Sequence, residues 1–238
     1  MAGVGHGWAL AVFPLVAAAI GGAFTAVLAR RLLDRWRWHE AVWVLALLMF
    51  ALASGAMFAG VLRGWEGTSF RLYWLFGAVL NVPFLLGGEV YLLTRRRALG
   101  HVVLAVLLLA GLYAGWRVWT APIHMGPLLG SLPLGKDVFG DNSLPYRLAQ
   151  VYSLPAYFLL LTGLVWSVWQ MKGRRELRDR AAGTFGIAVG ATIVAIGSGI
   201  GAAFHVVPLF SASLLAGIAV MFWGFLRASR PARVQAAS

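Results

Sequence analysis

The stretch that decides the fold is Phe70–Arg97, FRLYWLFGAVLNVPFLLGGEVYLLTRRR. Its apolar body is long enough to cross a bilayer, which takes about 20 residues, and it ends at three consecutive arginines. Asn81, Pro83 and Glu89 interrupt that body. Because an ionisable group inside a bilayer segment is rare and costly, Glu89 is a candidate functional residue.

Similar apolar stretches repeat along the whole chain of 238 residues. The chain is 61% hydrophobic and 12% charged, whereas soluble domains carry roughly 25% charged residues. We therefore predict an all-α polytopic membrane protein, a single domain over residues 1–238 with seven transmembrane helices. The predicted spans are residues 8–29, 41–62, 72–93, 99–119, 146–170, 181–204 and 207–226.

The basic residues gather in the turns between alternate spans. Fifteen of the 20 Lys and Arg residues lie on the side that holds residues 30–37, 95–97, 171–180 and the C-terminal tail. The positive-inside bias then predicts an N-terminus outside and a C-terminus in the cytoplasm. Since orientation explains the net charge of +12 and no basic groove is visible, we expect no nucleic-acid partner. The expected partners are the lipid bilayer, anionic lipid at the basic turns, and a membrane or cytoplasmic protein.

The third span has one small and polar face. At 100° per residue, Trp74, Asn81 and Gly88 lie on one stripe, and Glu89 lies on the same general side. Pro83 removes a backbone hydrogen bond, so a kink is expected there. One interpretation is a kinked helix that lines a cavity, with Glu89 as a proton, cation or ligand site towards the cytoplasmic half. The alternative is a structural Glu89 that pairs with an arginine at the interface.

The fifth span carries a second polar stripe in its outer half. Its residues, spaced by four, three and four, are Tyr146, Gln150, Ser153 and Tyr157. The long loop at residues 120–145 precedes them, and its prolines and glycines predict neither a helix nor a regular strand. The stripe indicates either an outward-opening ligand pocket beneath that loop, or hydrogen bonds between helices worth about 1 kcal/mol each.

The sixth span consists mainly of small residues. Gly186 and Gly190, and Gly197 and Gly201, form GxxxG pairs, which allow close approach of another backbone. The pattern predicts a central helix packed on several neighbours, or alternatively a dimer face.

The sequence leaves the cofactor open. There is no cysteine, and the candidate metal ligands are His124, His205 and Asp137 on the outer side, without any pair at helical ligand spacing. Haem is not expected because no histidine lies in the middle of a span. A retinal Schiff base is excluded because the only lysines, Lys136 and Lys172, lie in loops.

The run Phe70–Leu85 resembles a segment of multi-span membrane proteins of unknown activity from high-GC bacteria. The resemblance extends to Gly135–Gly140 in the long loop. It implies a location in the bacterial cytoplasmic (inner) membrane. No activity and no functional residue follow from it.

No motif in the chain specifies a reaction. The leading hypothesis is a small-ligand-binding or sensory membrane protein without catalysis. A proton-coupled transporter that uses Glu89 is an alternative, and so is a structural subunit of a membrane complex. A lipid-modifying enzyme is a further alternative, for which Glu89, His39, Glu40 and His101 would have to converge near the cytoplasmic interface.

Overall fold

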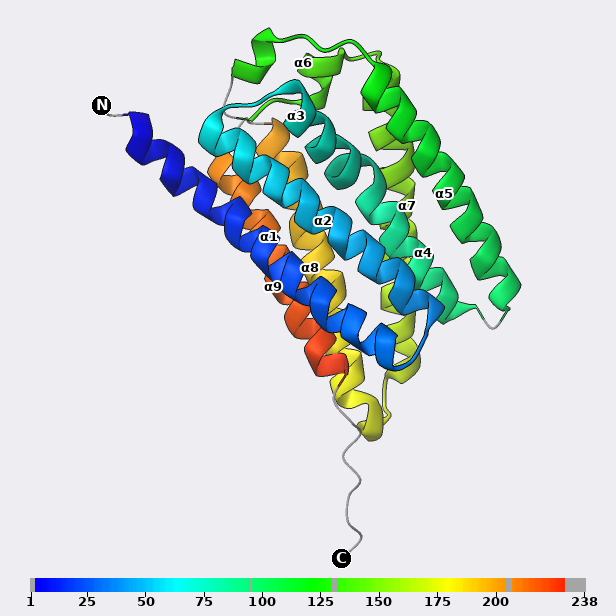
Figure 1. Cartoon of the computed structure of the whole chain (residues 1–238). Coiled ribbons are helices and arrows are strands. Elements are labelled where there is room, and N and C mark those ends of the chain that lie inside the picture. The colour runs from blue at the N-terminus through cyan, green and yellow to red at the C-terminus, as the bar shows by residue number, and fades with distance from the viewer. Residues whose placement is uncertain (1–2, 95, 130–131, 204–206, 230–238) are drawn as a thin grey trace, which may run out of the picture.

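The computed structural model describes residues 3–94, 96–129, 132–203 and 207–229, and these form a bundle of helices (Figure 1). Within these described residues, seven helical stretches are long and apolar enough to cross a membrane. The prediction of an all-helical chain with seven membrane-length helices is therefore confirmed. Their bounds are α1 (Gly3–Asp34), α2 (Trp38–Arg63), the third span from Gly67 to Leu93, α5 (Arg97–Thr120), α7 (Leu144–Met171), α8 (Arg178–Ala203) and α9 (Val207–Ala228).

Six of the spans form a closed ring. Neighbouring contacts run from α1 to α2, to the third span, to α7, to α8, to α9 and back to α1. Helix α5 lies outside this ring, against the third span and α7 (Figure 1). Its outer face exposes large apolar side chains such as Leu109 and Leu112, as a lipid-facing surface would.

The third span is not a continuous α-helix. A seven-residue π-helix, Trp74–Leu80, separates α3 (Gly67–Tyr73) from α4 (Asn81–Leu93). Pro83 has no N–H to donate into the turn before it. The carbonyls of Ala78 and Val79 instead accept hydrogen bonds from the Ser153 hydroxyl of α7, at 2.6 and 3.3 Å. Pro83 predicts an irregular helix, and the irregular segment is the π-helix just before the proline. There the Ser153 hydroxyl satisfies the carbonyls of Ala78 and Val79.

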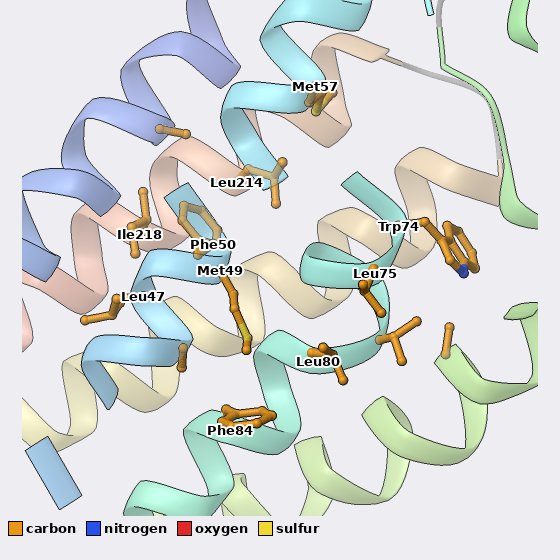
Figure 2. Close-up of a cluster of buried hydrophobic side chains, with 14 of the residues drawn as sticks. Leu47, Met49, Phe50, Met57, Trp74, Leu75, Leu80, Phe84, Leu214 and Ile218 are labelled. Atoms are coloured by element: carbon orange, nitrogen blue, oxygen red, sulfur yellow. The ribbon is translucent and has the colours of Figure 1, made fainter. Parts of the chain in front are cut away.

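One cluster of buried apolar side chains joins α2, the third span and α9 (Figure 2). It includes Leu47 and Phe50 of α2, Phe84 of α4, and Leu214 and Ile218 of α9.

Helix α8 packs most closely on α9. A Cβ on Gly190 would lie 2.5 Å from the carbonyl oxygen of Gly217, and Gly183 approaches the backbone of Gly224 in the same way. The prediction of a central helix is wrong, because α8 is one member of the ring, between α7 and α9. The small residues of α8 mainly allow the backbones of α8 and α9 to approach each other closely.

The long loop contains two short helical turns. They are a 3-10 turn at Gly126–Leu129, η2, and a five-residue α-helix at Gly135–Phe139, α6. The prediction of no helix in residues 120–145 is wrong at this point. Val138 and Phe139 are buried in the bundle, so tertiary packing overrides the proline and glycine content of the loop.

Candidate functional site

A cavity of about 1850 Å³ opens at one end of the ring. We call this the basic end, defined by residues 30–37, 171–180 and 227; the opposite end, capped by α6, is the loop end. Among the described residues, the lining comes from all six ring helices and includes none from α5. Along α7 the lining extends from Met171 back to Leu160, about 16 Å at 1.5 Å per residue. That is roughly half of a 30 Å hydrocarbon core.

The lining changes with depth. Arginines surround the mouth: Arg31, Arg35, Arg37, Arg174, Arg178, Arg180 and Arg227. Apolar side chains line the inner part: Phe24, Leu28, Leu47, Leu85, Leu160, Leu164, Ile187, Met221 and Phe225. The cavity therefore joins a charged mouth to an apolar interior.

Glu89 lies within this cavity on α4. Its side chain is buried, at 2% exposure. The Ser167 hydroxyl of α7 lies 3.5 Å from its Oε1, and a Cβ added to Gly163 would be 3.2 Å from its Cγ. In the described part of the chain no Lys, Arg or His nitrogen lies within 4.0 Å of its carboxylate. The alternative of a structural ion pair is thus not seen there, and Arg95 lies outside the described residues.

A second buried carboxylate belongs to Glu40 on α2, at 6% exposure. Its Oε1 lies 3.3 Å from Arg37 Nη1 and 3.9 Å from His39 Nε2. Its Oε2 is buried and has no hydrogen-bond partner among the described residues. An unsatisfied buried acceptor is costly, so this carboxylate lowers the stability of the bundle beside the cavity.

Trp43 forms the wall between α2 and α4. Its Nε1 donates to the carbonyl of Leu85 at 3.1 Å. The indole lies against Gly88, where any added Cβ would overlap the ring. Gly88 is therefore required, because a larger residue next to Glu89 would displace the Trp43 indole from the cavity wall.

The other polar residues of the third span face elsewhere. Asn81 is buried and its Nδ2 donates to the Ala46 carbonyl of α2 at 2.8 Å. Trp74 donates from Nε1 to the Pro145 carbonyl at the loop end, at 3.1 Å. Neither residue lines the cavity. The π-helix between them changes the angle per residue, so Trp74 leaves the stripe that an ideal α-helix predicts.

The outer stripe of α7 makes contacts between elements. Tyr146 stacks on Trp74 with ring centroids 6.2 Å apart, and Tyr157 donates to Thr192 Oγ1 of α8 at 3.2 Å. Ser153 bonds the π-helix, whereas Gln150 is exposed. None of these residues lines the basic-end cavity.

The residues considered for a lipid-modifying site are only partly together. His39, Glu40 and Glu89 line the cavity. His101 lies outside it on α5, where its Nδ1 is 2.9 Å from the Tyr91 hydroxyl. The set of four therefore does not converge.

The metal candidates do not form a cluster in the described chain. His124 and Asp137 belong to the loop end, where the backbone N–H of His124 donates to the Val138 carbonyl. His205 lies outside the described residues. Among those residues no group of three His, Asp or Glu is placed to hold a metal ion.

Sequence reasoning missed Ser167 and Gly163, the α7 residues that face Glu89. The available signal was a glycine and a serine four residues apart in the basic half of the fifth span, which share one helix face. No family model, no curated protein and no solved structure matches the chain.

Proposed function

We propose that this protein binds a small ligand in the basic-end cavity and has no catalytic chemistry of its own. The observation that carries the proposal is a cavity of about 1850 Å³ whose wall holds the buried carboxylate of Glu89, which has no ion pair among the described residues. The cavity is larger than usual ligand pockets, which enclose about 300–1,000 Å³, so it has room for a small ligand. In the orientation that the basic residues predict, the cavity opens to the cytoplasm of a bacterium, and the chain lies in the inner membrane.

The burial of two carboxylates costs folding free energy, and this cost supports a functional role for the cavity. Glu40 and Glu89 are both buried with few partners, and buried acids in a membrane are expensive. Residues that lower stability without a packing role are typical of functional sites, because activity there outweighs stability. A purely structural bundle would gain by filling this space with apolar side chains.

Access to the cavity can be tested because the chain has no cysteine. Thr184 lines the cavity, and the adjacent Phe185 is exposed on the outer face of α8. In membrane vesicles, Thr184→Cys should react with a water-soluble maleimide, since its thiol meets water. Phe185→Cys should stay unlabelled in lipid. Equal labelling of the two variants would contradict a hydrated cavity.

Occupancy is tested by native mass spectrometry of gently purified protein. We expect a co-purified molecule on the wild type and on Phe185→Trp, and its loss from Thr184→Trp, which fills the cavity. Both variants must elute as single species so that loss of folding is recognised. Retention of the same molecule by Thr184→Trp would overturn the proposed location.

A proton-coupled transporter that uses Glu89 is the second candidate. The observation that favours it is that one span combines a π-helix, a feature often found at functional sites, with an acid that has no ion pair in the part of the chain that the structure describes. In liposomes, Glu89→Gln should abolish pH-gradient-driven flux of the co-purified molecule, while the exposed Glu176→Gln should not. Unchanged flux in Glu89→Gln would remove this candidate.

A further inference from the structure

We infer that the ligand is an anionic amphiphile from the membrane: its charged group sits among the arginines at the mouth, and its apolar chain fills the inner cavity. This inference rests on the proposed function and deepens it. It differs from general attraction of anionic lipid to basic turns, because it assigns one molecule to an enclosed site.

Arginine is the predominant cation at the mouth. The lining contains seven arginines and His39, together with the acids Asp34, Glu176 and Asp179. A guanidinium presents a planar fork of donors that matches phosphate or carboxylate oxygens. Arg35, Arg174, Arg178 and Arg180 form no ion pair within the described chain. These four guanidinium groups are therefore available to an anionic group.

Two contacts fix the position of Arg31. Its guanidinium lies 4.9 Å above the Phe225 ring and its Nη1 donates to Ser229 Oγ at 2.7 Å. These contacts, from α1 to α9 and to the residue just after it, hold a cation where the apolar lining begins. An amphiphile needs this boundary, since its charge and its chain are joined at one point.

The cavity reaches about 16 Å inward from the end of α7, close to the thickness of one leaflet. A lipid of that leaflet has its headgroup at the level of the arginines and its chains at the level of Leu47 and Leu160. It would therefore occupy the cavity in the same orientation that it has in the bilayer.

Glu89 lines the cavity four residues before α4 ends at Leu93. Its carboxylate can accept a hydrogen bond from a hydroxyl near the headgroup of an occupant, whereas it would repel a second anionic group. The site therefore fits one anionic group, a hydroxyl-bearing neck and an apolar chain.

The experiment uses the full chain in detergent and native mass spectrometry with three probes. They are phosphatidylglycerol, which is anionic and carries hydroxyls, phosphatidylcholine, which is zwitterionic, and inorganic phosphate. We expect one tightly bound phosphatidylglycerol, little phosphatidylcholine, and no displacement by phosphate. The double variant Arg35→Gln/Arg178→Gln should bind phosphatidylglycerol about tenfold more weakly, and Thr184→Trp should not retain it.

The matched control is Arg97→Gln, which removes an exposed arginine of α5 that does not line the cavity. It should leave phosphatidylglycerol binding unchanged. Equal weakening by Arg97→Gln, or full binding to Thr184→Trp, would mean peripheral attraction and overturn the inference. Displacement by inorganic phosphate, or a co-purified neutral or cationic molecule, would overturn the ligand class but keep the proposed function. Only the absence of any bound molecule together with an unlabelled Thr184→Cys would remove both.

Discussion

The two ends of the ring differ in how far side chains fill the space between the helices. At the loop end, aromatic side chains fill the space between the helices: Trp65, Phe70, Tyr73, Trp74, Phe139 and Tyr146. At the basic end, α1, α2, α4, α7, α8 and α9 surround a cavity of about 1850 Å³. The third span and α7 take part at both ends, so the same two helices border a filled region at one end and an open one at the other.

The loop itself completes the closed end. Phe70 is fully buried, with its ring centroid 5.5 Å from that of Phe139 in α6. Trp74 lies against Gly135 and donates to the Pro145 carbonyl. At the basic end the charged side chains of the 171–180 turn border the cavity instead. The loop end is therefore filled by packed side chains, and the basic end holds the cavity that we propose as the ligand site.

The largest expected difference is in the effect of removing a phenylalanine at each end. Phe70→Ala should lower the free energy of unfolding by about 3–5 kcal/mol, because it opens a void in a filled region. Phe225→Ala should cost about 2 kcal/mol, since Phe225 already borders a cavity and less new void is created. Denaturant unfolding in one detergent compares them. Equal losses would mean that the two ends are equally packed.

The next prediction concerns whether α6 closes the loop end. Gly135→Val should destabilise the protein by about 1–3 kcal/mol, because the new side chain overlaps the Trp74 indole. Gly126→Val is the control, as nothing lies within 4 Å of a Cβ at that position. Thermal unfolding followed by tryptophan fluorescence measures both. A neutral Gly135→Val would show that α6 does not close the loop end.

The sequence predicts the number and the approximate bounds of the helices that form these two ends. Hydropathy marks the spans to within a few residues at most ends, since a membrane helix needs a long apolar run whatever its neighbours are. The same logic identifies Glu89 as an unusual buried acid. The membrane orientation stays a prediction, since it depends on the basic residues alone.

Tertiary contacts account for what sequence reasoning missed. The α-helical period places Trp74 with Asn81, but the π-helix separates them, and that depends on backbone hydrogen bonds. The small residues of α8 predict close packing, yet not which helix they pack on. The group that faces Glu89 comes from a helix 78 residues further along the chain. Only the folded ring brings these parts together.

A smaller effect concerns the acid at the basic end. Glu89→Gln should raise the free energy of unfolding by about 1–2 kcal/mol, because it replaces a buried carboxylate that has one weak partner by a neutral amide. Glu176→Gln, exposed at the mouth of the same cavity, should change it by less than about 0.5 kcal/mol. Thermal unfolding of the two variants provides the comparison. A destabilised Glu89→Gln would instead indicate an ion pair with an arginine.

The smallest effect concerns the π-helix that joins the two ends. The Ser153 hydroxyl is the hydrogen-bond donor from α7 to the carbonyls of Ala78 and Val79. Ser153→Ala should therefore cost about 0.6–1 kcal/mol, the usual value of a hydrogen bond between membrane helices. Thr162→Ala is the control, because Thr162 bonds only the Phe158 carbonyl of its own helix. Amide hydrogen exchange should quicken over residues 74–84 in Ser153→Ala and stay unchanged in Thr162→Ala. Unchanged exchange in both variants would mean that packing against α2, and not this hydroxyl, maintains the π-helix.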